Sequence, residues 1–97
     1  MRASAEATAL DARPVLTRRA RLRFDRLSGG HVLLGPERGF RLNASAAAVL
    51  ALCDGQHSVL QIAQGLAPPE QEERVLADVV ALVQQLAGRG LLTVIDP

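Results

Sequence analysis

Hydrophobic and polar residues alternate strictly at the start of the folded part of the chain. Over residues 19–25, three arginines and an aspartate occupy one set of alternate positions, while Ala20, Leu22 and Phe24 occupy the other. A period of two is typical of a strand with one face in solvent and one face buried. The pattern predicts a first strand over 19–25 whose apolar residues face the core.

Two shorter apolar segments follow, and a turn introduces each of them. Ser-Gly-Gly precedes residues 31–34, and Pro-Glu-Arg-Gly precedes residues 40–42. Segments joined by such turns pair with their neighbours as antiparallel strands. We therefore expect a three-stranded meander with strands one and three at its edges. The row of arginines on strand one and the proline-containing segment before it disfavour pairing of a further strand there. Strand three is therefore the open edge.

After strand three the hydrophobic period becomes helical. Asn43 and Ser58 are good N-cap residues, Asp54-Gly55 and Pro68-Pro69 are stop signals, and Gly88 ends the last helical pattern. The expected elements are helices over residues 44–53, 59–66 and 70–87 and a final extended segment over residues 91–95 that could pair or pack. The fold class is α+β, a three-stranded antiparallel sheet packed on three helices, like a winged helix-turn-helix.

The chain has room for one domain. It contains 97 residues, and a chain of this size encloses a single core. Residues 1–12 carry no consistent period and precede Arg13-Pro14, where a helix is disfavoured. We expect a flexible tail over 1–12 and one domain over 13–97.

Composition and the lengths of the apolar runs argue against a secreted or a membrane-spanning protein. A single cysteine cannot close an internal disulfide, which suits a reducing compartment. The longest apolar run, residues 46–53, is far shorter than the roughly 20 residues of a membrane-spanning helix. Arg18-Arg19 is not followed by the apolar stretch of an export signal. We expect a cytoplasmic protein with no targeting segment and no membrane contact.

The side chains for catalysis are scarce. There is no Trp, Tyr or Lys, and there are two His, so Schiff-base chemistry is excluded. Cys53, Asp54 and His57 lie close in sequence, but a closed zinc site needs about four ligands. We expect Cys53 to be a small buried hydrophobic residue. We therefore expect that the protein is not an enzyme and that it binds no metal and no cofactor.

Charge is divided along the chain. Residues 13–41 hold eight arginines and two acidic residues, whereas residues 54–78 hold five acidic residues and Arg74. A basic sheet with three helices leaves a DNA-binding winged-helix transcription factor as the alternative function. In that fold the third helix enters the major groove, yet here it begins Glu-Gln-Glu-Glu, which repels phosphates. We expect no nucleic-acid binding.

The third helix has more apolar surface than one core contact requires. At 100° per residue its apolar residues cover an arc of roughly 160°, against about 100° for a helix with one buried face. Leu76 and Val80 lie at one border of this arc. An open strand edge beside surplus apolar surface can bind an extended peptide by strand addition. Two other interpretations remain. The helix could pack between two halves of its own domain, or the open strand edge could self-associate.

Several motifs together resemble the PqqD family of coenzyme PQQ (pyrroloquinoline quinone) synthesis proteins. The resemblance spans residues 13–95 and is carried by Leu-Leu-Gly-Pro-Glu at 33–37, Leu-Asn-Ala-Ser-Ala at 42–46, Leu-Cys-Asp-Gly at 52–55, Ser58-Val59, Ile62-Ala63 and Gly-Leu-Leu at 90–92. It implies a non-catalytic peptide chaperone, the founding type of the recognition elements for ribosomally made, modified peptides (RiPPs).

The resemblance also implies partners and a binding site. Such proteins bind the PQQ precursor peptide and present it to a radical S-adenosylmethionine (SAM) enzyme that crosslinks its Glu and Tyr. The peptide adds to the third strand and lies against the third helix. On this sequence the expected peptide-binding residues are Phe40, Arg41 and Leu42 on the strand and, from helical phase, Arg74, Leu76, Ala77 and Val80 on the helix. We expect a monomer, with dimers by strand exchange as the other state.

Overall fold

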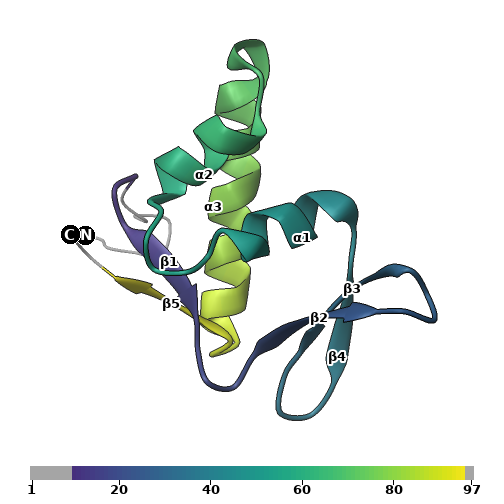
Figure 1. The fold of residues 1–97 in the computed structure, drawn as a ribbon. Helices are drawn as coiled ribbons and strands as arrows, with labels where there is room; N and C mark the ends of the chain where they lie inside the picture. Colours follow the sequence, from purple (N-terminus) through teal and green to yellow (C-terminus); the bar gives the residue numbers. More distant parts are fainter. Residues whose placement is uncertain (1–9, 96–97) are drawn as a thin grey trace.

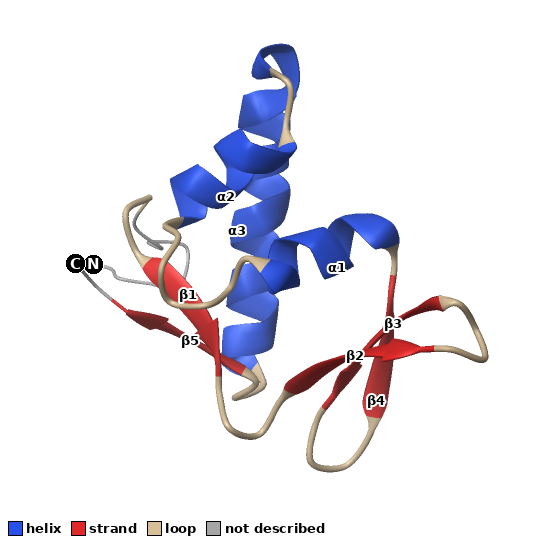
Figure 2. Ribbon diagram, in the orientation of Figure 1, coloured by secondary structure: helices blue, strands red, loops and turns tan. Residues whose placement is uncertain are grey.

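The structure, a computed structural model, describes residues 10–95 of the chain. Its elements are β1 (Arg13–Leu16), β2 (Arg21–Asp25), β3 (Gly30–Leu34), β4 (Gly39–Leu42), α1 (Ala44–Ala51), α2 (Val59–Leu66), the 3-10 turn η2 (Pro69–Gln71), α3 (Glu72–Gly88) and β5 (Leu92–Ile95). Strands β2, β3 and β4 form an antiparallel sheet in that order, and β1 pairs with β5 (Figures 1 and 2). The predicted fold class is confirmed. In the described part of the chain, no helix has both the length and the apolarity to cross a membrane.

The three-stranded sheet has one face against the helices, as its period of two predicts. Leu33, on the middle strand β3, is fully buried, and Leu22 and Phe40 beside it pack on the core. Phe24 was expected in the core as well, but 57% of its surface is exposed. It lies near the β2–β3 turn, which projects away from the helices (Figure 1), so its ring contacts His31 edge-on instead.

Side-chain caps determine where α1 and α2 begin. The Asn43 side chain accepts a hydrogen bond from Ala46 N–H at 2.7 Å, so α1 begins directly after β4. Ser58 and Gln61 form a capping box at the start of α2, which satisfies two amide groups that a helix end otherwise leaves unpaired. Both starts agree with the sequence prediction, whereas α1 ends two residues earlier than predicted.

The core lies where α3 meets α2 and the sheet. Val79 and Val83 of α3 and Val59 and Ile62 of α2 are fully buried, together with Leu33 of β3. The predicted start of the third helix near Glu70 lies in η2, and the α-helix begins at Glu72. One side of α3 thus joins the helical layer to the sheet.

The sequence analysis did not predict β1. The extended segment 91–95 pairs with it, from Arg13 opposite Ile95 to Leu16 opposite Leu92. Pro14 lacks an N–H and is tolerated because β1 is an edge strand; its carbonyl accepts a hydrogen bond from Gly55 N–H at 3.0 Å.

The predicted N-terminal tail falls mainly on residues 1–9, which lie outside the described residues. Its last residues are held in the fold, because the carbonyls of Leu10 and Ala12 accept hydrogen bonds from Leu60 and Val59 of α2. Ala12 is fully buried. The backbone of these residues is therefore part of the fold.

Truncating Leu33 tests the position of the core. Leu33→Ala should lower the free energy of unfolding by about 2–5 kcal/mol, because it leaves a cavity at a fully buried site. Leu27→Ala is the matched control, since Leu27 is 98% exposed in the β2–β3 turn. Urea unfolding followed by circular dichroism measures both changes. Equal stabilities of the two variants would contradict the described core.

Candidate functional site: the open edge of β4

Among the described residues, strand β4 pairs with another strand on one side only. The sheet order is β2-β3-β4, and β5 pairs with β1 in a separate sheet. Within residues 10–95 no strand pairs with the outer side of β4. This side therefore offers unpaired backbone groups to a further strand.

The hairpin geometry shows which backbone groups face the open side. Gly35 N–H donates to the Arg38 carbonyl at 2.9 Å, so the pair that closes the turn is hydrogen-bonded. Hydrogen-bonded and non-bonded pairs alternate along an antiparallel ladder. Phe40 and Leu42 are then bonded to β3, whereas Gly39 and Arg41 direct their N–H and C=O groups outward. The edge offers two donors and two acceptors.

A hollow runs beside this edge, between β4 and α3. Its volume is about 250 Å³. The strand contributes Phe40, Arg41 and Leu42, and the other lining residues are Leu33, Asn43, Ala46, Leu82, Gln85, Leu86 and Arg89. A guest strand paired with β4 would place alternate side chains over it.

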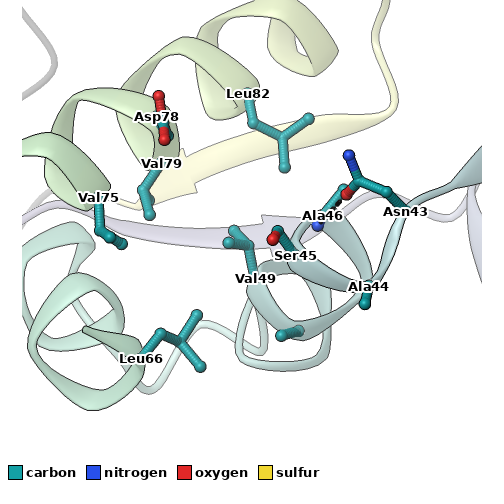
Figure 3. A pocket seen from close by; sticks show the side chains of 11 residues that line it. Asn43, Ala44, Ser45, Ala46, Val49, Leu66, Val75, Asp78, Val79 and Leu82 are labelled. Carbon is teal, nitrogen blue, oxygen red and sulfur yellow. Dashed lines mark hydrogen bonds between the residues drawn. The ribbon is translucent and has the colours of Figure 1, made fainter. Parts of the chain in front are cut away.

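A larger apolar hollow of about 590 Å³ continues from the first toward α2. The two share Asn43, Ala46 and Leu82. Figure 3 shows Leu66, Val75 and Leu82 surrounding this space, with α1 forming its wall. Asp78 lines it as well.

A third hollow of about 460 Å³ adjoins the other end and shares Phe40 and Arg89 with the first. Its remaining lining residues are Arg19, Gly35, Pro36, Glu37, Arg38 and Leu91. We call the three adjoining hollows the β4 trough. It is apolar toward α2 and basic toward the β3–β4 turn.

The structure brings together three of the seven predicted binding residues. Phe40, Arg41 and Leu42 line the trough, and Arg41 is exposed on the strand edge. The four helix residues, Arg74, Leu76, Ala77 and Val80, line none of its three hollows. Arg74 and Ala77 are exposed, whereas Leu76 and Val80 pack against the core. Their role in peptide binding stays a prediction.

The trough is lined by a different face of α3. At 100° per residue, Leu76 and Val80 lie about 120° and 160° around the helix from Leu82. Sequence reasoning did not single out Leu82, Gln85 or Arg89. Leu82 belongs to the wide apolar stripe, but the stripe alone does not show which of its borders faces β4.

The Cys53, Asp54 and His57 group does not form a reactive site. Burial, with a smaller contribution from Asp54, raises the pKa of the Cys53 thiol to about 12, so the thiol is protonated at neutral pH. Its S–H donates to the Val49 carbonyl at 3.3 Å. His57 Nδ1 lies 3.0 Å from Asp54 Oδ1. The described residues contain no group of three or more His, Cys, Asp or Glu that could hold a metal ion.

Two aspartates stabilise turns. The N–H of Gln56 and the His57 side chain hold the pKa of Asp54 below its usual value. The Ser28 hydroxyl, and then the Leu27 N–H, lower the pKa of Asp25 in the β2–β3 turn. Both carboxylates accept hydrogen bonds at turns, which is a structural role.

Comparison with known proteins places this geometry in a family. The family described as "Coenzyme PQQ synthesis protein D (PqqD)" matches residues 30–92. A PqqA binding protein of Rhodopseudomonas palustris (strain HaA2) is 43% identical over 83 residues, which cover 84% of this chain and 81% of that protein. The bifunctional coenzyme PQQ synthesis protein C/D of Methylorubrum extorquens is 43% identical over 81 residues, 81% of this chain and 22% of that longer protein.

A solved structure agrees with these relatives. The solution structure of the PqqD part of Methylobacterium extorquens PqqCD, described as a functional and stand-alone RiPP recognition element, has a TM-score of 0.74 and 40% identity. The match covers 92% of this chain and 97% of that one. The resemblance seen in the sequence is confirmed: the chain belongs to the PqqD family of coenzyme PQQ synthesis proteins.

Proposed function

We propose that this protein is a non-catalytic peptide chaperone of PQQ synthesis that captures the precursor peptide PqqA as a fourth strand on β4. The observation that carries the proposal is the open edge of β4 with an apolar trough beside it. Relatives named PqqA binding protein support the choice of peptide. The backbone groups of Gly39 and Arg41 would bind the peptide backbone, and the trough would select its side chains.

Strand addition suits a protein that must also release its cargo. Net hydrogen bonds contribute about 1 kcal/mol each in water, and ordering the peptide costs several kcal/mol. The complex would therefore be reversible, and the peptide would pass to the radical SAM enzyme of the pathway. The fusion of a related domain to a second PQQ synthesis protein in Methylorubrum extorquens supports action beside pathway enzymes. We propose that the protein works in the cytoplasm as a monomer, since the edge of β4 must remain free.

The helix wall of the site comes from the face of α3 that carries Leu82. The alternative wall is the predicted set of Arg74, Leu76, Ala77 and Val80. Leu82 is favoured because it lines both the hollow beside β4 and the larger apolar hollow. An apolar residue of the peptide would replace water over Leu82, Val75 and Leu66.

Proline at position 41 tests strand addition directly. Arg41→Pro removes one outward N–H donor, and proline is tolerated on an edge strand. It should weaken binding of a synthetic PqqA peptide at least fivefold in calorimetry. Arg41→Gln, which loses the charge but keeps the N–H, is the matched control and should bind more tightly than the proline variant. Equal affinities of the two variants would argue against backbone pairing at β4.

Alanine substitutions of two leucines on α3 test which face of the helix contacts the peptide. Leu82→Ala and Leu76→Ala remove the same atoms from half-buried positions of one helix, so both should lower the free energy of unfolding. We expect Leu82→Ala to weaken PqqA binding by about tenfold, and Leu76→Ala by less than twofold. The reverse order of affinities would instead support the helix face expected from the sequence.

A further inference from the structure

Three arginines from separate parts of the chain converge at the basic end of the trough. The Arg38 and Arg89 guanidinium carbons lie 5.2 and 5.3 Å from the centroid of the Phe40 ring. Arg19 lines the same hollow, with one guanidinium nitrogen 3.5 Å from the position that a Cβ would take at Gly90. One half-buried ring thus holds two cations over its surface, and a third cation lies nearby.

Within the described residues, none of these three arginines has a partner of opposite charge. Between residues 10 and 95 the only salt bridge joins Asp54 and His57, which line no part of the trough. Glu37 lines the basic hollow but forms no ion pair with any of the three arginines. Like charges that line one hollow repel each other, and an anion bound among them offsets this repulsion. Because guanidinium groups have a planar fork of donors, they bind a carboxylate through two parallel hydrogen bonds.

We propose that Arg38, Arg89 and Phe40, with Arg19 beside them, form a subsite for an aspartate or glutamate side chain of the peptide bound along β4. This inference rests on the proposed function, because it assumes that the peptide lies on that edge. Phe40 positions the two guanidinium groups, and the carboxylate binds between them.

The position of the subsite predicts the spacing of acidic and apolar residues in the bound peptide. The arginines lie near the Gly39 end of β4, and the apolar hollow begins beside Asn43, just after the other end of the strand. Side chains of an extended chain that face the same side are separated by even numbers of residues. The cargo should therefore carry an acidic residue two or four positions from an apolar residue, both directed toward α3.

A double-mutant cycle between protein and peptide tests the subsite. The protein variants are Arg38→Gln/Arg89→Gln and a control with the same charge loss, Arg23→Gln/Arg26→Gln, whose side chains are exposed on the β2–β3 hairpin. The probes are a synthetic PqqA peptide, a set in which each acidic residue is replaced in turn by its amide, and a C-terminally amidated form. Affinity is measured by fluorescence anisotropy at low salt, and thermal unfolding checks that each variant is folded.

We expect the site variant to bind the unmodified peptide about tenfold more weakly and the control variant to change less than twofold. One amide substitution should weaken binding to the parent protein by a similar factor and have no further effect on the site variant. The inference is overturned if every amide substitution weakens binding to the parent and to the site variant equally. It is also overturned if the control variant loses as much affinity as the site variant. A third contrary result is that only amidation of the peptide C-terminus is coupled to the arginines. In these cases binding that remains sensitive to Arg41→Pro would leave the proposed function standing. Absence of any binding to the parent would overturn both.

Discussion

The unpaired backbone edge of β4 is the constraint on which the rest of the site depends. Two features keep it open. Asn43 caps α1 directly after the strand, so the chain leaves the sheet instead of turning back to pair with β4. The last strand, β5, follows α3 but is held by β1 through four residue pairs. The last described strand thus pairs elsewhere, and no described strand occupies the position beside β4.

The apolar stripe of α3 is wide because it packs against α2 and the sheet and also lines the trough. Val79 and Val83 form the core with α2 and the sheet. Leu82 and Val75, on one side of them, line the trough, while Leu76 and Val80, on the other side, pack against the core. A helix with one buried face would need about 100° of apolar surface. The additional arc serves both the fold and the site.

Local signals in the sequence predicted most of the elements, because strand periodicity, turn residues and caps act over a few positions. The caps Asn43 and Ser58 and the open third strand are examples. Strand β1 was missed because it is four residues long, contains Pro14 and acquires its structure from β5, which lies far along the chain. The exposure of Phe24 depends on where the helical layer ends. Periodicity gives the width of an apolar stripe but not the direction of its neighbours, so the predicted helix wall of Arg74, Leu76, Ala77 and Val80 did not include Leu82, which lines the trough. The cluster of Arg19, Arg38 and Arg89 joins residues distant in sequence and has no local signal.

Amide hydrogen exchange of the protein with and without PqqA peptide is the most direct measurement. If the peptide pairs with β4, exchange at Gly39 and Arg41 should slow strongly on binding, because their N–H groups gain partners. Phe40 and Leu42, already bonded to β3, should change much less. This alternation would not arise from a peptide that covered the surface without pairing. Protection confined to β2, or equal protection of all four β4 amides, would contradict the account.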